Sequence, residues 1–388
     1  MSVQPLSDYE LLPIYVRVAD NLRAKMDAGE FAVGSYLPGE LELSKAFGLS
    51  RGTIRKALDI LAAEGRISRQ PGRGTVVLPV RKRATTRPQI AVVWSIIRAI
   101  GADMLAGLES AIAQAGYDLL FSTSEHAPAK EAEILARLAE SDVAGIVLYA
   151  TGEPQNDALI ETIIANGIPL VLIDRFMPAL ADRVSWVTSE NEQGAYELTR
   201  YLIQLGHRRI AYALCTVDNE NISTLTERHA GYLRALKDAG LNPDPALLFS
   251  IYGASCLELD NAEVARRFLV FIQQQQPTAV FFVNDAMALR IYPYLRRGGI
   301  RIPNDLSIAG FDRLRLPYDV NPLDLTSVAQ DFNSLGVEAG KVITRLIQNP
   351  AHAPLHIRVP VSLYIGATTA PPATVMTGQP ETGMPVSG

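Results

Sequence analysis

Hydrophobic positions repeat with two different patterns along the chain, and the change between them falls near residue 89. Before it, apolar side chains recur at helical spacing, as Ile54, Leu58 and Leu61 do at i, i+4 and i+7. From residue 89 to about residue 361, short apolar runs alternate with amphipathic segments. The pattern predicts a small helical domain followed by a larger body in which strands and helices alternate.

Three helices and a hairpin are predicted in the first region. Residues 14–28 form an amphipathic helix that Gly29 closes, and a second helix, beginning at the prolyl segment 37–38, ends at Gly48. Only two residues separate Gly48 from Arg51, which is the spacing of a helix-turn-helix. Residues 64–78 then predict a β-hairpin with a Gly- and Pro-rich tip. Together these elements predict a winged helix-turn-helix.

The third helix carries the chemistry of this region. Ser50 is suited to cap it, because a hydroxyl can accept a free amide at a helix start. Arg51, Gly52, Arg55 and Lys56 lie away from the apolar stripe, so the first two turns present cations and room for a close approach. For an isolated helix this would be an ordinary solvated face, but in a helix-turn-helix it suits DNA phosphates and base edges.

The stretches "LPGELELSKAFGLSRGTIRKALDILAAEG" and "GRGTVV" between Gly34 and Val77 resemble the GntR family of bacterial transcription regulators. Many members of that family have a basic residue where Leu41 stands, so no DNA contact is expected from Leu41. The resemblance and the cationic helix face together give the expected DNA-binding residues, namely Ser50, Arg51, Thr53, Arg55 and Lys56 on the helix and Gly72 and Arg73 in the wing.

Charge is distributed unevenly between the two regions. Residues 1–87 contain 14 Lys and Arg against 9 Asp and Glu, whereas the rest of the chain contains 22 against 32. The overall net charge of −5 therefore combines a basic N-terminal region with an acidic body. Such an asymmetry favours attraction of one end of the molecule to a phosphate backbone.

The body is predicted to be α/β, with two lobes that each contain a doubly wound parallel sheet. The first lobe would use strands at 90–94, 118–121, 145–149 and 169–173. The second would begin with the strand at 184–187 and continue through strands at 209–214, 279–283 and 306–309. Ligands in such sheets bind at the carboxyl ends of the strands.

Polar residues follow several of these strands. Asp174 and Arg175 come after one strand, Asn284 after another and Asp312 after a third, and Gln330 follows a short apolar segment. Two of them have an ordinary structural alternative: Asp174 could be a turn residue, and Asn284 could be a helix cap. Asp285 is expected to cap the helix that follows it.

The stretches "VLIDR", "LGHRRIAY", "RHAGYLRAL", "VFFVNDAMAL", "GIRIPNDLSIAGFD" and "QDF" resemble the LacI/GalR repressors and, through them, periplasmic sugar-binding proteins. The resemblance implies that the cleft binds a sugar-like effector, with hydroxyl contacts from Asp174, Arg228, Asn284, Asp312 and Gln330 and ring stacking on Trp94 and Phe332. Arg175, beside Asp174, is counted with this set. Carboxylates and guanidinium groups can bracket paired hydroxyls, and aromatic rings suit the apolar sugar face.

Other classes of protein are disfavoured. A glycine-rich dinucleotide turn, a GxSxG elbow and a P-loop lysine are all missing from the sequence, so we expect no enzyme, no catalytic residue and no cofactor. The five histidines and two cysteines have no metal-ligand spacing, and we expect no metal. No apolar run approaches the ~20 residues that span a bilayer, and no signal peptide is evident, so we expect a cytoplasmic protein.

The predicted organisation is a winged-helix DNA-binding domain (1–78), an extended basic linker (79–88), a LacI-type effector-binding domain of two lobes (89–368) and a disordered tail (369–388). Whether the linker only connects or also touches DNA phosphate stays open. The combination resembles hybrid regulators of the arabinose-repressor kind. It implies a homodimer on palindromic operator DNA that represses a carbohydrate-utilisation operon until a sugar binds. A purine-like corepressor, or activation instead of repression, is the alternative.

Overall fold

The structure, a computed structural model, describes residues 13–70, 73–78, 87–95, 99–216, 222–252, 259–314 and 323–373. Gly72, Cys256 and residues 79–86 of the predicted linker lie outside the described residues. The chain divides into two compact units, residues 1–86 and 87–388.

The first unit is a three-helix domain with a small antiparallel sheet of strand order β1-β3-β2. Its elements are α1 (Ile14–Asp27), β1 (Tyr36–Leu37), α2 (Glu40–Phe47), α3 (Arg51–Ala63), β2 (Ile67–Gln70) and β3 (Gly74–Val77). The apolar stripe of α3 is fully buried with Val18 and Leu22 of α1, Leu43 of α2 and Ile67 and Val77 of the hairpin. The helix-turn-helix and the hairpin predicted from the sequence are therefore present.

The second helix starts later than predicted. Tyr36 and Leu37 pair with Val76 and Thr75 as strand β1, so they are not available to a helix. Gly39 becomes the N-cap, and the carboxylate of Glu42 accepts its backbone N–H at 3.0 Å. This hydrogen bond, one half of a capping box, fixes the first turn of α2 at Glu40.

The second unit, the body, contains two six-stranded sheets. The sheet of the first lobe has the order β14-β8-β7-β6-β4-β5, and that of the second lobe has the order β10-β9-β11-β12-β13-β15. All neighbouring strands are parallel except β13 and β15. The strands are β4 (Gln89–Trp94), β5 (Asp118–Thr123), β6 (Gly145–Tyr149), β7 (Leu170–Asp174), β8 (Ser185–Ser189), β9 (Ile210–Thr216), β10 (Leu248–Tyr252), β11 (Ala279–Phe282), β12 (Ser307–Asp312), β13 (Thr326–Ala329), β14 (His356–Val359) and β15 (Ser362–Tyr364).

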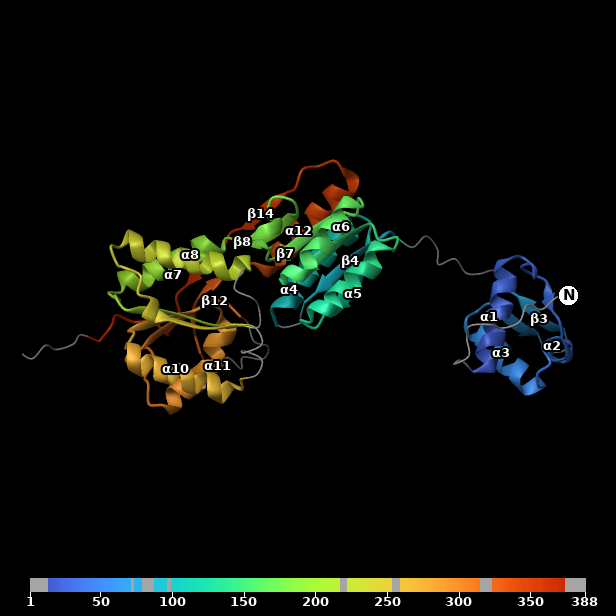
Figure 1. Cartoon of the computed structure of the whole chain (residues 1–388), viewed down its shortest axis with the longest axis horizontal. Coiled ribbons are helices and arrows are strands. Elements are labelled where there is room, and N and C mark those ends of the chain that lie inside the picture. Colours follow the sequence, from blue (N-terminus) through green and yellow to red (C-terminus); the bar gives the residue numbers. More distant parts are fainter. Residues whose placement is uncertain are drawn as a thin grey trace, which may run out of the picture. The chain divides into compact units, whose positions relative to one another are not determined.

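Helices cover both faces of each sheet (Figure 1), which explains why the central strands are apolar throughout. In the first lobe, α4 and α12 pack on one face and α5 and α6 on the other. In the second lobe, α7 and α8 pack on one face and α10 and α11 on the other. These helices are α4 (Ala99–Gln114), α5 (Pro128–Ala139), α6 (Asp157–Ala165), α7 (Asn191–Gln204), α8 (Ser223–Asp238), α10 (Asn261–Gln275), α11 (Asp285–Arg297) and α12 (Phe332–Gln348); short 3₁₀ turns are η1 (Pro154–Asn156), η2 (Pro178–Leu180) and η3 (Pro245–Leu247).

The doubly wound, two-lobed body is confirmed, but one strand was assigned to the wrong lobe. Strand β8 pairs with β7, with Ser185 opposite Val171, so it belongs to the first sheet and not to the second set. The chain enters the second lobe only after Ser189, returns after Ala329 through α12, and crosses again after Val359. Three crossovers therefore join the lobes.

The end of the body was also placed too early. The tail was predicted to be disordered from residue 369, but the backbone carbonyl of Ala370 accepts hydrogen bonds from His207 Nε2 at 2.9 Å and Ser307 Oγ at 3.0 Å. The hydroxyl of Thr369 meets those of Tyr201 and Thr326 at 3.1 and 2.9 Å. His207 is thus a structural residue that holds this segment against the second lobe.

No helix among the described residues is long and apolar enough to cross a membrane. The same part of the chain brings no three His, Cys, Asp or Glu side chains together as a group that could hold a metal ion.

We predict that Gly336→Ala strongly destabilises the first lobe. Helices α4 and α12 approach so closely that a Cβ at Gly336 would lie 1.9 Å from the backbone oxygen of Met104. Overpacking of this kind costs about 1–3 kcal/mol or more, because backbone must move. The free energy of unfolding of the full chain, followed by tryptophan fluorescence, measures the effect. Lys341→Ala on the exposed side of α12 is the control, and equal stability of the two variants would contradict this account of the packing.

Candidate functional site

The polar residues predicted from strand ends gather where the carboxyl ends of the two sheets meet. Asp174 ends β7 in the first lobe, and Asp312 ends β12 in the second. Both are buried, and both have positive φ, +71° and +110°. Non-glycine residues rarely adopt this region, and such conformations concentrate at binding sites.

A buried arginine organises the second-lobe side of the site. Arg228 Nη2 lies 3.3 Å from Asp312 Oδ1, and Gln330 Nε2 donates to the same oxygen at 2.7 Å. Arg228 also donates from Nη1 to the backbone oxygen of Val283 at 2.8 Å. Its guanidinium carbon lies 3.8 Å from the centre of the Phe311 ring. The structure therefore brings three of the predicted ligand-binding residues into direct contact.

The same arginine begins a chain of hydrogen bonds toward the first lobe. Arg228 Nε donates to Asn191 Oδ1 at 2.9 Å, and Asn191 Nδ2 donates to Thr188 Oγ1 at 3.1 Å. Thr188 Oγ1 in turn donates to the backbone oxygen of Asp174 at 2.6 Å. Asn191 is the first residue after the crossover from β8, so this chain connects the aspartates of the two lobes.

The first-lobe side contains a cationic and aromatic cluster. Arg175 Nε lies 3.4 Å from Asp174 Oδ2, and Arg175 Nη2 donates to the hydroxyl of Tyr149 at 2.8 Å. Trp94 meets Tyr149 edge-on at 5.3 Å between ring centres. Trp94 and Phe332 both belong to the apolar core of this lobe, and Trp94 is only 1% exposed.

Asn284, and not Asp285, caps helix α11. Asn284 is the N-cap of α11, since its Oδ1 accepts the backbone N–H of Met287 at 2.9 Å. Asp285, which was expected to cap, is instead the first helical residue, and its buried carboxylate accepts hydrogen bonds from Ser327 and Leu314. The cap interpretation of Asp285 was therefore wrong.

The electrostatics of the site reflect its burial. The pKa of Asp312 is raised to about 6, chiefly by burial; the charge of Arg228 opposes the rise, the Asp174 carboxylate adds to it, and the hydrogen bond from Gln330 opposes it. Burial also raises the pKa of Asp285 to about 7, with the negative charge of Asp312 as a second cause. The site thus contains several carboxylates within one another's field and a buried guanidinium to balance them.

Several residues of this cluster escaped the sequence reasoning. Tyr149 ends β6 and Asn191 comes two residues after β8, so the strand-end rule that selected Asp174 could have selected them too. Ser327 lies inside β13 and gives no comparable signal. Arg228 is the sixth residue of α8, which begins at Ser223.

In the first unit, five of the predicted DNA-binding residues lie at the N-cap and in the first two turns of α3. Ser50 caps this helix: its Oγ accepts the backbone N–H of Thr53 at 3.2 Å and meets the Thr53 hydroxyl at 2.9 Å. Arg51 and Lys56 are exposed, and Lys56 Nζ lies 5.6 Å from the centre of the Tyr15 ring.

Arg55 is held by an acidic partner on α2. It forms a two-pronged ion pair with Glu40, with N–O distances of 2.9 and 3.2 Å. Arg73 is exposed at the start of the hairpin's second strand, and its wing neighbour Gly72 lies outside the described residues.

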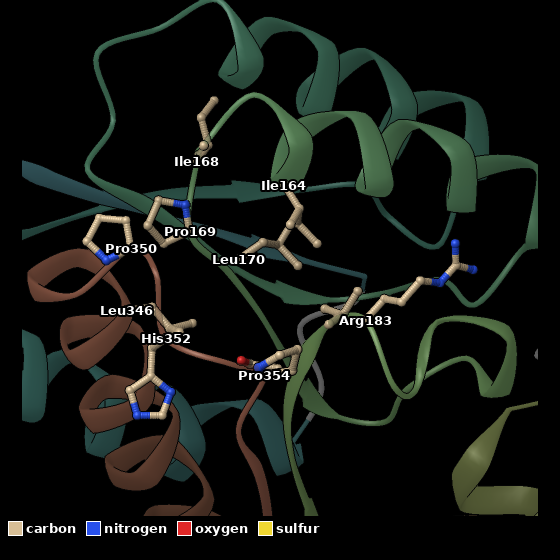
Figure 2. Close-up of a pocket in the computed structure, with 12 residues that line it drawn as sticks. Ile164, Ile168, Pro169, Leu170, Arg183, Leu346, Pro350, His352 and Pro354 are labelled. Carbon is tan, nitrogen blue, oxygen red and sulfur yellow. The ribbon is translucent and has the colours of Figure 1, made fainter.

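A surface pocket of about 180 Å³ lies in the first lobe, at the amino ends of β7 and β8 and so at the opposite edge from the aspartates. Figure 2 shows Ile164, Leu170 and Leu346 around it, with the guanidinium of Arg183 pointing away. None of the predicted ligand-binding residues lines this pocket.

Comparison with known proteins agrees with both units. Residues 14–77 match the model of the gntR family of bacterial regulatory proteins, and residues 199–369 match a periplasmic binding protein-like domain. The arabinose metabolism transcriptional repressor of Geobacillus stearothermophilus is 28% identical over 343 residues, which cover 87% of this chain and 92% of the relative. The repressor PurR of Vibrio atlanticus is 29% identical over 269 residues, 69% of this chain and 77% of the relative. The solved complex of the regulator CelR with cellobiose covers 86% of this chain and all of that chain, with a TM-score of 0.63 and 21% identity.

The fold and these matches define a class: a GntR-type helix-turn-helix domain joined to a periplasmic-binding-protein-like body of the LacI type. The chain is a ligand-responsive, DNA-binding transcription regulator of this hybrid kind.

We predict that Asp285 makes the stability of the body depend on pH. Because its pKa is raised from 3.8 to about 7 in the folded state, the folded state binds this proton more tightly than the unfolded chain. The resulting stability is complete below pH 3.8 and is lost as the pH rises toward 7, by at most about 1.4 kcal/mol per pH unit. Asp285→Asn should flatten this slope between pH 5 and 7.

Denaturant titrations of the full chain, read from the two tryptophans in the first lobe, measure this slope. Asp305→Asn is the matched control, since the exposed carboxylate of Asp305 pairs with Arg301 and has its pKa lowered to about 2. An identical slope in wild type and Asp285→Asn would show that Asp285 ionises as it does in the unfolded chain.

Proposed function

We propose that the protein represses a carbohydrate-utilisation operon and leaves its operator when a sugar binds between the two lobes. The observation that carries this proposal is the buried polar chain from Asp312 through Arg228 and Asn191 to Asp174. It offers carboxylate acceptors and guanidinium donors at the carboxyl ends of both sheets, and these groups are suited to paired hydroxyls. The arabinose-repressor relative and the cellobiose complex of CelR support a sugar as the effector class.

The effector would be bracketed from both lobes. Asp174 and Arg175 would contact it from the first lobe, and Arg228, Asp312 and Gln330 from the second. Asn284 uses its Oδ1 for the helix cap, which leaves its amide group for a ligand acceptor. Because Trp94 and Phe332 lie mainly in the core, Tyr149 is the better candidate for a stacking partner beside Arg175.

A ligand that touches both lobes favours their closed arrangement. Contacts between the lobes are already present in the first half of α8. Phe176 N donates to Ser223 Oγ at 2.9 Å, and Arg358 of β14 forms an ion pair with Glu227 at 2.7 and 3.1 Å. Glu227 directly precedes Arg228, so a movement of α8 would change both the ligand contacts and the connection to the first lobe.

DNA binding is assigned to residues 1–78, with residues 79–88 as the linker. We expect a cytoplasmic homodimer on a palindromic operator, because two identical helix-turn-helix domains related by a two-fold axis match two half-sites. Closure of the bodies would alter the spacing of the two heads and remove the avidity of the dimer.

A purine-like corepressor is the second candidate, which the sequence leaves open. In that case ligand would strengthen operator binding rather than release it. The acidic pair Asp174 and Asp312 favours a polyhydroxyl ligand over a purine.

Arg51→Ala should weaken operator binding by about 1–3 kcal/mol if Arg51 makes a two-pronged base contact. Lys56→Ala should weaken binding to all sequences more evenly and reduce the salt dependence by about one counterion. Gel-shift titration at fixed salt, with operator and unrelated DNA, separates the two effects. Lys25→Ala is the matched control, because Lys25 lies on α1 and pairs with Glu30. Unchanged operator affinity of Arg51→Ala would refute the assignment of α3.

Asp312→Asn should weaken sugar binding, and with it the response to sugar, while operator affinity is kept. The change preserves size but replaces a charged acceptor, and the loss of a charge-assisted hydrogen bond costs ~2–5 kcal/mol of binding. Thermal shift and calorimetry of the full chain against arabinose, cellobiose and a purine base measure it, because a ligand of the folded state raises the Tm. Asp305→Asn is again the control. If Asp312→Asn binds sugar as tightly as the wild type, the effector does not bind at Asp312 and the proposed site is wrong. Stabilisation of the wild type by the purine base alone would favour the corepressor.

A further inference from the structure

Asp285 is a buried carboxylate that the proposed function does not use. It is 3% exposed and lies at the start of α11, directly after the cap residue Asn284. Its Oδ1 accepts a hydrogen bond from Ser327 Oγ at 2.7 Å, and its Oδ2 accepts one from the backbone N–H of Leu314 at 2.9 Å. The carboxylate therefore joins three elements: α11, strand β13 and the segment that leaves β12.

The segment that leaves β12 has a backbone conformation that needs support. Asp312 and Arg313 have φ values of +110° and +52°, in the left-handed region that side chains disfavour. Arg313 N donates to Ser327 Oγ at 3.1 Å, and Leu314 N donates to Asp285. Both backbone donors of this turn are thus held by the pair formed by Asp285 and Ser327.

The direction of the Asp312 carboxylate depends on this turn. Asp312 lies at its first position, and its Oδ1 must meet both Arg228 and Gln330. If the backbone relaxed to negative φ, the side chain would leave that direction. We infer that Asp285 is a positioning residue of the effector site, which acts by holding the turn that aims Asp312 at Arg228. This inference rests on the proposed function, because it gives Asp285 a role in the same cleft.

A glycine in the neighbouring strand supports the same reading. A Cβ at Gly310 would lie 2.2 Å from Asp285 Oδ1 and 3.3 Å from its Cα. Strand β12 therefore leaves space at this position for the carboxylate. Asparagine could occupy the same space, because its oxygen can accept from Leu314 N and its amide can donate to Ser327 Oγ. Alanine can do neither.

A double-mutant cycle tests the inference, with arabinose and cellobiose as probes and the full chain as the protein. Asp285→Ala should lower affinity for the bound sugar by about tenfold to a hundredfold, and Asp285→Asn by less than about threefold. In an Asp312→Asn background, Asp285→Ala should cause almost no further loss, because it acts through Asp312. An equal loss in both backgrounds would overturn the positioning role, since a general weakening of the lobe predicts equal losses.

A measurement without ligand keeps this test separate from the proposed function. Amide hydrogen exchange at Leu314 should be slow in the wild type and at least tenfold faster in Asp285→Ala, while Asp305→Ala leaves it unchanged. If neither sugar binds the wild type, the proposed effector class fails, but faster exchange in Asp285→Ala still supports the anchored turn. If exchange at Leu314 is the same in both proteins, the inference fails whatever sugar binds. Should Asp285→Ala not fold, Ser327→Ala removes the other half of the anchor and should release the Arg313 amide in the same way.

Discussion

The candidate site depends on the hydrogen bonds and the ion pair made by the buried guanidinium of Arg228. A charge with so little exposure is costly unless every donor is satisfied and an opposite charge is close. Asn191 Oδ1, the backbone oxygen of Val283 and the carboxylate of Asp312 meet these requirements, and the Phe311 ring covers one face. Loss of the Asp312 carboxylate would leave an uncompensated buried charge, and loss of the Asn191 amide oxygen would leave a buried donor unpaired. The three partners come from β12, from α7 and from the residue that follows β11.

The position of α8 turns this local arrangement into a connection between the lobes. Glu227 pairs with Arg358 on the edge strand β14 of the first lobe, while the next residue, Arg228, reaches Asp312 in the second. Behind Arg228, the hydrogen bonds through Asn191 and Thr188 continue to the backbone of Asp174. A ligand that replaces or adds to contacts at either aspartate therefore acts on a network shared by both lobes. That is the physical requirement for a binding event to favour one arrangement of the lobes over another.

How much of this was predictable from the sequence depends on the range of the interactions involved. The cap at Ser50 and the apolar stripe of α3 are local, and the sequence predicted both correctly. The rule that ligands bind at strand ends selected Asp174, Asp312 and Gln330 because the order of strands and polar residues is visible in the chain. Strand β8 went to the wrong lobe because only its pairing with β7 decides its sheet. The contacts of Asp285 with Ser327, 42 residues away, depend on tertiary packing that no local pattern encodes.

The two compact units limit how an effector can reach the DNA. The winged-helix core of α1, α2, α3 and the hairpin is complete in itself, and the body has its own four apolar layers. Within the first unit, Glu40 holds the side chain of Arg55, one of the residues proposed to bind DNA, so the geometry of Arg55 does not require the body. Under the proposed function, the ligand therefore has no single base contact to switch off. Its influence must pass through the residues between the units and through the partner subunit, so that regulation acts on the avidity of two heads rather than on the affinity of one.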